Sequence, residues 1–453
     1  MSIELAQRVL GMVPAGVEAE VFVDHMARAL TRFANSFIHQ NVADATTTVR
    51  LRLHADGRTA SGATTVTTDE GLRGLVSRTL DAARLCPPDA GWPGLAPPAA
   101  LASEGNWNEE TAKASPEARA DRVRAFVDAA GGLETAGYCR TLHWSAAFAN
   151  SAGQVVTGRT AEVAMDGIAR VEGADGTARV ASGRLSDVDG AVLGARAAAK
   201  ARAGAGAVEL PPGRYEVVLE ATAVVDVLHN LSLYGFNGKA YNERQSFAEP
   251  GAQQLDAAVT LVDDPLGDTG LGIPFDAEGT PKRPVEFVSG GVTQAVAHDR
   301  RTAAEAGGES TGHAGLGVRT RGALPVNLGL MPGPAASSVE AGAVIDPAAA
   351  SLVAGVERGL LVTDLWYTRV LDPKSLVVTG LTRNGVWLIE DGELTRPVRN
   401  FRFTQSYPQA LGPGAVLGVG GQATVFPDPW GIAWWTAPAL RLASWNFTGG
   451  ASG

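Results

Sequence analysis

The chain has 453 residues, of which 45% are apolar and 19% charged, so it is long enough for two domains and apolar enough to fill their cores. Its formal charge is −10, and no run of Lys or Arg occurs. Binding to nucleic acid or to an anionic membrane depends on clustered positive charge, so both kinds of partner are argued against.

Two cysteines, Cys86 and Cys139, are too few for a disulfide framework or a thiolate metal site. The chain also has no apolar run of transmembrane length, and its first residues lack the basic and apolar regions of a secretory signal. These features predict a cytoplasmic protein.

The first two hundred residues predict helices and strands in alternation. An apolar stripe predicts a helix over the first ten residues. A period of two predicts a strand from residue 16 onwards, followed by a second extended run at about 27–33. An Asp-Gly pair at 56–57 predicts a hairpin. The remaining predictions in this part are strands at 46–54 and 59–67, a helix that starts at 69 and is stopped by the prolines at 87–88, a helix at 116–130, short strands between 138 and 185, and an Ala-rich helix at 187–203.

A segment rich in Gly and Pro, GAGAVELPPG, follows the last of these helices and indicates a linker. We therefore expect an N-terminal domain over residues 1–205, a linker at 206–213 and a C-terminal domain over 214–453. The second half predicts a strand at 215–219, a helix at about 221–234 and then many short strands. The predicted fold class is α+β: a mixed α/β sheet domain, followed by a mainly antiparallel β domain that is barrel-like or strongly curved and has few helices.

No motif of general catalysis stands out. The seven histidines include no pair three or four residues apart, and neither a G-x-S-x-G sequence nor a phosphate-binding loop of the Walker type occurs. The helix at 221–234 carries His229 beside its apolar stripe, followed by Asn230 and Tyr234. From the pattern alone, this segment is a core helix with a polar tip.

Several short motifs, in this order and spacing, resemble the TldD/PmbA family, also called the modulator-of-DNA-gyrase family, over nearly the whole chain. The first is AEVFVDHMARALTRFANSFIHQN at 19–41. The others are VTLVDDP at 259–265, PFDAEG at 274–279, ESTGH at 309–313, MPG at 331–333, RGLLV at 358–362 and GVWLIE at 385–390.

The resemblance implies one of two kinds of subunit, which pair in this family. The TldD-like kind carries H-E-x-x-x-H on the first helix of the C-terminal domain, and a late cysteine supplies a further zinc ligand. The PmbA-like, or TldE-like, kind lacks these residues. In this chain His229 stands where the first histidine would be, Asn230 where the glutamate would be and Tyr234 where the second histidine would be, and the late segment LGVGGQ at 417–422 has no cysteine.

These replacements remove the chemistry of a catalytic zinc centre. Such a centre needs about three protein ligands, a phenol keeps its proton near neutral pH, and an amide cannot act as a general base. We therefore expect no zinc in this chain.

The spacing of the family motif also predicts a local distortion of this helix. Its two histidines are five residues apart, and such positions lie about 140° apart around an ideal α-helix. The spacing therefore suggests a π-type turn, which we expect in this chain without a metal.

Two further segments supply candidates for a substrate cleft. Phe275, Asp276 and Glu278 could line a peptide cleft, although a turn stabilised by Asp276 and closed by Gly279 is the favoured interpretation. Ser310, Thr311 and His313 lie on a predicted loop that could bind a substrate backbone or serve structure alone. With His229, Asn230 and Tyr234, these residues complete the set of candidates.

The resemblance thus implies the non-metal subunit of a TldD–TldE type zinc metallopeptidase that cleaves unfolded or modified peptides. A TldD-like partner would supply the zinc and the catalytic glutamate. One alternative is a stand-alone homodimeric protein that binds peptides or acts as a scaffold without catalysis. Another is metal-independent catalysis around His229, Tyr234 or the loop at 310–313.

Overall fold

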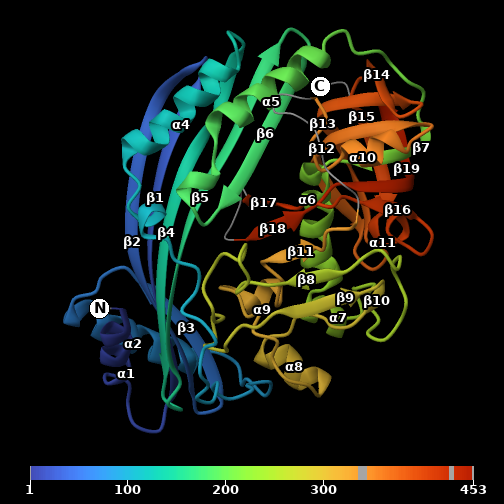
Figure 1. Cartoon of the computed structure of the whole chain (residues 1–453). Helices are drawn as coiled ribbons and strands as arrows, with labels where there is room; N and C mark the ends of the chain where they lie inside the picture. Colours follow the sequence, from blue (N-terminus) through green and yellow to red (C-terminus); the bar gives the residue numbers. More distant parts are fainter. Residues whose placement is uncertain (1, 335–343, 428–432, 451–453) are drawn as a thin grey trace.

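The structure is a computed structural model that describes residues 2–334, 344–427 and 433–450, and it shows a mixed α+β protein (Figure 1). The N-terminal half forms a six-stranded sheet in the order β3-β2-β1-β4-β5-β6, with every neighbouring pair antiparallel. The strands are β1 (Glu18–Ala34), β2 (Phe37–Ala55), β3 (Arg58–Thr64), β4 (Glu134–Asn150), β5 (Val155–Val171) and β6 (Ala174–Ser182).

Helices cover the face of this sheet to which β1, β2, β4 and β5 turn apolar side chains at odd-numbered positions. Val21 and Val23 pack under α1 and α2, whereas Cys139 and Met165 pack under α4 and α5. The helices predicted from sequence are confirmed. They are α1 (Ser2–Leu10), α2 (Asp69–Leu85), α4 (Pro116–Ala129) and α5 (Gly190–Ala203), with the short α3 (Glu109–Ala112) and η1 (Leu185–Asp187) beside them.

The prediction of short strands between 138 and 185 is wrong, because β4 and β5 are each 17 residues long. Glycines that look like chain breakers instead lie inside the strands. A Cβ at Gly167 would collide with the ring of Phe126, and one at Gly158 with Pro274. These glycines let a helix and a loop approach the sheet closely, so they mark packing rather than turns. Likewise β1 is one continuous strand, where the sequence suggested two extended runs.

The other face of the sheet, made by even-numbered positions, is also buried. Phe22 and Phe148 pack against Ile273 and Phe275, and Leu142 packs against Trp434, all from the C-terminal half. Polar residues that alternation would turn toward solvent, such as Glu20 and Glu162, are therefore buried.

In the C-terminal half, five strands form a closed ring in the order β12-β7-β19-β15-β13, because β13 pairs back with β12. The β7–β12 pair is parallel and the other ring pairs are antiparallel. This ring confirms the barrel-like prediction. Its strands are β7 (Gly213–Leu219), β12 (Arg358–Asp372), β13 (Val377–Glu390), β15 (Phe401–Ser406) and β19 (Leu440–Gly450), with β14 (Glu393–Pro397) and β16 (Val416–Val419) at its margins.

A second sheet of short strands, in the order β10-β9-β8-β11-β18-β17, connects the ring side to the long sheet through contacts of β17 with β6. The strands are β8 (Leu261–Asp263), β9 (Val285–Ser289), β10 (Val292–Thr293), β11 (Leu328–Leu330), β17 (Thr424–Pro427) and β18 (Trp434–Ala437). The helices of this half are α6 (Ala221–Asn230), the π-helix η2 (Leu231–Gly235), α7 (Gly238–Asn242), α8 (Arg300–Ala306), α9 (Val318–Arg321), α10 (Ala350–Ala354) and α11 (Tyr407–Ala410).

The chain passes between the halves at 206–213, and the domain boundary there stays a prediction. The segment is held in place, because Val208 exchanges backbone hydrogen bonds with Pro397 and Arg399.

A buried ion pair lies beside this segment. Lys200 on α5 forms it with Glu220, and both side chains are almost fully buried. Glu220 also accepts a hydrogen bond from the backbone N–H of Asp346 at 2.8 Å. This ion pair fixes α5 to the start of α6.

We predict that Lys200→Met lowers the free energy of unfolding by about 3–5 kcal/mol, because it leaves the Glu220 carboxylate buried without a cation. Urea denaturation would measure the change, and Lys200→Met combined with Glu220→Gln should recover part of it. Lys113→Met is the control, since its partner Glu109 is exposed and the pair should contribute nothing measurable. Equal losses in the two single variants would contradict the prediction.

Candidate functional site

The helix that carries His229 ends in a π-turn. The apolar side chains of Val224, Leu228 and Leu231 are buried in the C-terminal core, which fixes the face that α6 presents to it. After Asn230 the chain widens into η2, and the N–H of Phe236 donates to the carbonyl of Leu231 at 2.8 Å, a bond five residues apart. The expected π-type turn is confirmed.

His229 and Tyr234 line one cavity of about 570 Å³ beside the π-turn. The ring of His229 stands edge-on to Trp435, with 5.5 Å between the ring centroids. Lys239, Glu243 and Arg321 add charged groups to the same walls, which are otherwise largely apolar. The arrangement can receive a peptide-sized ligand with polar groups.

Asn230 does not share that cavity. Its side-chain amide is buried and donates to the backbone carbonyl of Asp226 at 2.9 Å and to the Asp226 carboxylate at 3.2 Å. The same carboxylate accepts hydrogen bonds from the hydroxyls of Tyr407 at 2.6 Å and Thr368 at 2.7 Å. Desolvation raises the pKa of Asp226, and the Tyr407 and Thr368 hydroxyls oppose that rise. Asp226 was not recognised from the sequence, although it lies one helical turn before Asn230.

The side chains around His229 do not fit a zinc centre. The indole of Trp435 stands edge-on to its imidazole and the phenol of Tyr234 lines the same cavity, while the Asn230 amide is committed to Asp226. In the part of the chain that the structure describes, no three His, Cys, Asp or Glu side chains lie close enough together to hold a metal ion. One imidazole without further ligands gives only weak metal binding.

The segment at 275–279 forms the turn that the sequence favoured. One carboxylate oxygen of Asp276 accepts hydrogen bonds from the backbone N–H groups of Glu278 and Thr280, both at 2.9 Å, and the other accepts from Ala314 at 3.0 Å. Gly279 closes the turn with φ of +76°. Burial and the neighbouring Glu278 raise the pKa of Asp276 to about 7, against the lowering effect of the three N–H groups. Phe275 is buried against Phe22.

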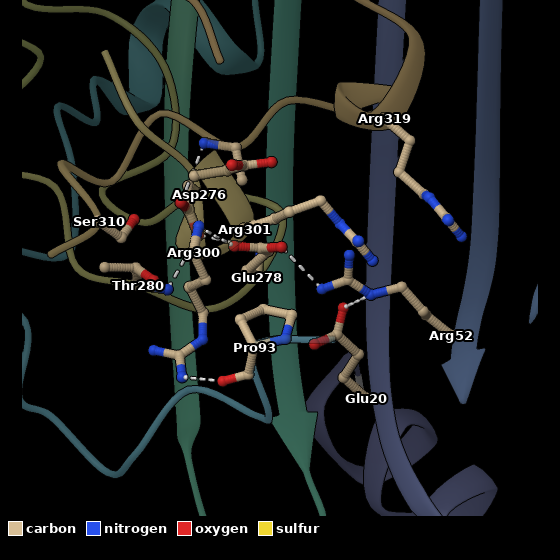
Figure 2. Close-up of polar contacts among 12 residues, drawn as sticks. Glu20, Arg52, Pro93, Asp276, Glu278, Thr280, Arg300, Arg301, Ser310 and Arg319 are labelled. Carbon is tan, nitrogen blue, oxygen red and sulfur yellow. Dashed lines mark hydrogen bonds and ion pairs between the residues drawn. The ribbon is translucent and has the colours of Figure 1, made fainter. Parts of the chain in front are cut away.

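Glu278 leaves this turn and joins a buried ion-pair network between the halves (Figure 2). One of its oxygens accepts from the Arg52 guanidinium at 2.8 Å, and the other accepts from the backbone N–H of Arg300 at 3.0 Å. The Arg52 guanidinium also lies 2.6 Å from the carboxylate of Glu20. Figure 2 shows the two carboxylates on either side of Arg52.

Glu20 and Arg52 were missed because strand alternation places both on the side that was taken to face solvent. The register of β1 and β2 identifies the pair, because it places Glu20 directly opposite Arg52. The pKa of Glu20 is raised to about 7. Desolvation and the nearby Glu278 raise it, whereas Arg52 and Arg300 lower it.

The polar groups of the loop at 310–313 bond to neighbouring parts of the protein. The hydroxyl of Thr311 lies 2.9 Å from Nδ1 of His313, which is buried, and Nε2 of the same ring lies 3.4 Å from the carboxylate of Asp263. Ser310 lines a cavity of about 360 Å³ together with Thr280 and Arg300.

The structure does not bring all nine candidate residues into one site. His229 and Tyr234 share one cavity, and the residues of the segments at 275–278 and 310–313 lie elsewhere.

A family model described as the PmbA/TldA metallopeptidase C-terminal domain matches residues 212–449, which is more than half of the chain. The chain belongs to the PmbA/TldD family. The resemblance found in the sequence motifs is thereby confirmed. No curated protein matches the chain.

Three solved structures share the PmbA/TldD fold of this chain nearly from end to end. TldE from Thermococcus kodakarensis is 18% identical with a TM-score of 0.84, and the match covers 98% of this chain and 99% of that one. A protein described as a modulator of a DNA gyrase from Thermotoga maritima is 20% identical with a TM-score of 0.83, covering 98% and 99%. A modulator of DNA gyrase from Bacteroides thetaiotaomicron is 18% identical with a TM-score of 0.80, covering 98% of both chains. At these identities the likeness shows the fold alone.

Among the described residues of this PmbA/TldD family member, none of the helices has the length and apolar character that a membrane span requires.

We predict that Glu20→Gln flattens the pH dependence of stability. Burial raises the pKa of Glu20 in the folded protein to about 7, against an ordinary value of 4.5. Stability should therefore fall as pH rises through this window, by up to about 1.4 kcal/mol per pH unit for this one proton. Glu20→Gln removes that contribution, as urea denaturation between pH 4.5 and 8 would show.

Glu134→Gln is the matched control, because Glu134 is an exposed carboxylate at the start of β4. Asp276 titrates in the same range in both proteins, so the difference between wild type and variant isolates Glu20. Parallel curves for wild type and Glu20→Gln would show that Glu20 is ionised throughout.

Proposed function

We propose that this chain is the non-metal, TldE-like subunit of a heterodimeric zinc metallopeptidase that cleaves unfolded or modified peptides. The observation that supports it is the donor set on the first helix of the C-terminal half. By the family resemblance, Asn230 and Tyr234 stand beside His229 where a catalytic glutamate and a second histidine would be needed. In this proposal a TldD-like partner supplies the zinc ion and the general base.

The cavity beside the π-turn gives this chain a role of its own in the pair. It provides a wall of His229, Tyr234 and Trp435 with charged groups at Lys239 and Glu243. Such a surface can hold a peptide by its backbone and side chains while the partner performs hydrolysis. The proposal places the pair in the cytoplasm and leaves this chain inactive alone. A homodimer without catalytic activity is the competing outcome.

Reconstitution tests the proposal. We predict that a TldD-like chain carrying H-E-x-x-x-H, purified together with this chain, cleaves an unfolded test peptide, and that a chelator abolishes the cleavage. Each chain alone should be inactive or nearly so. Cleavage by this chain alone in the presence of EDTA would instead establish metal-independent catalysis, and failure to form a mixed complex would favour the stand-alone homodimer.

The zinc content of the isolated chain gives a second test. After dialysis against zinc and then against buffer, we predict no stoichiometric zinc by elemental analysis, because one imidazole supplies too few ligands. The His229→Ala variant should give the same value as wild type. Zinc retained by wild type and lost from His229→Ala would contradict the proposal and indicate a metal site in this chain.

A further inference from the structure

One edge of the long sheet is left without a neighbouring strand over part of its length. β3 pairs with β2 only from Val49 to Ala55, so the preceding residues 38–48 of β2 have β1 on one side. No strand in the described part of the chain pairs with their other side (Figure 1). Residues 39–45 are all exposed, whereas β13 and β17 lie against β6 at the opposite edge. We call residues 38–48 the open edge.

The open edge turns a row of backbone hydrogen-bonding groups away from the protein. Ala55 and Arg58 flank the two-residue turn between β2 and β3 and pair directly, so Ala55 turns its N–H and C=O toward β3. Backbone direction alternates along a strand, so the other odd-numbered residues of β2 face the same way. The N–H and C=O groups of residues 41, 43 and 45 therefore point outward.

This edge lacks the features that usually keep exposed strands from pairing. Natural proteins protect such edges with Lys or other charged side chains, with Pro, or by keeping the strand very short. The open edge contains no Lys, Arg or Pro, and its one acidic side chain is Asp44. Val42 is exposed although it is apolar. These features indicate that another strand pairs with the open edge.

The open edge is complementary to itself. A two-fold axis perpendicular to the sheet at Val42 aligns two copies in antiparallel orientation, with Val42 opposite Val42 of the second copy. The outward groups of Asn41 then pair with those of Ala43 in the second copy, and the reverse. Val42 falls in a pair without backbone hydrogen bonds, where side chains approach most closely, and its β-branched side chain suits such a pair.

The polar side chains on the same face favour this alignment. The guanidinium of Arg32 on β1 donates to Oε1 of Gln40 at 3.3 Å, so the amide N–H groups of Gln40 can donate to a further acceptor. The two-fold alignment places Asp44 of the second copy opposite Gln40, where its carboxylate accepts from the amide with the charge of Arg32 behind it. An axis at Asp44 would instead set two carboxylates face to face. A peptide of arbitrary sequence has no carboxylate at this point.

We propose that two copies of this chain pair along their open edges in antiparallel orientation, with Val42 at the two-fold axis, and so join their long sheets into one. This contact is separate from the pairing with a metal-bearing partner proposed above, because the described residues that line the cavity of His229 include none of the open edge.

Cysteine trapping tests the alignment. In a Cys86→Ser background, which leaves only the buried Cys139, Val42→Cys should form a disulfide-linked dimer on mild oxidation, because directly opposed Cα atoms in such a pair are about 4.5 Å apart. Ala43→Cys is the matched control. Residue 43 is also exposed, but it lies diagonally from its own copy at about 7–8 Å, too far for a disulfide. Equal cross-linking of the two variants, or none with Val42→Cys, would overturn the proposal.

Light scattering of the full chain measures the association without a cross-link. The wild-type chain should dimerise, and Ala43→Pro should weaken dimerisation about tenfold or more, because it removes an outward N–H and no bond to β1. Ala43→Val keeps the N–H and should dimerise like wild type. A wild-type chain that stays monomeric up to about 1 mM, or a proline variant that dimerises like wild type, would contradict the proposal.

Two further measurements separate the possible occupants and the two proposals. A monomeric wild-type chain that binds an unfolded test peptide, with binding lost in Ala43→Pro, would assign the open edge to peptides and overturn the pairing of two copies. Zinc-dependent cleavage by the pair reconstituted with Ala43→Pro should equal that of wild type. If cleavage occurs while cross-linking and dimerisation fail, only this inference is wrong and the proposed function stands.

Discussion

The position of Arg52 between two carboxylates is the constraint on which the junction of the two halves depends. Its guanidinium bridges Glu20 on its own sheet and Glu278 from the C-terminal half, and all three side chains are largely buried. A buried charge is tolerated only when it is paired and hydrogen-bonded. Separating the halves would therefore leave Glu278 without this partner, so the turn after Phe275 is held at one place on the sheet.

The same requirement explains the long sheet. In β1, β2, β4 and β5 the odd-numbered positions pack under four helices, and even-numbered positions of β1, β4 and β5 pack against the C-terminal half. Interior glycines such as Gly158 and Gly167 make this double packing possible, because any larger side chain would collide with the covering layer. The polar residues enclosed on the even face must then find partners within the protein, as Glu162 does with Arg140 and Trp434.

The helix α6 and its π-turn, which the family spacing predicts, are held by side chains of the C-terminal half. Asn230 is bonded to Asp226, and Asp226 is held in turn by Tyr407 and Thr368, so the turn is maintained by hydrogen bonds. His229 is left facing an aromatic wall at Trp435. This geometry is consistent with a subunit that shapes a peptide site beside a catalytic partner, as we propose.

The sequence by itself determined the helices α1, α2, α4, α5 and α6, the hairpin at Asp56-Gly57, the turn at Asp276, the π-turn and the family, because each depends on local periodicity, capping, glycine conformation or an ordered set of motifs. Only the tertiary structure decided the length of β4 and β5, the closed ring with its second sheet, and the pairing of Glu20, Arg52 and Glu278. Glu20 and Arg52 are far from Glu278 in sequence, and strand alternation marks the first two as solvent-facing. Their burial depends on which layer covers the even face, and that is a property of contacts between distant segments rather than of any local pattern.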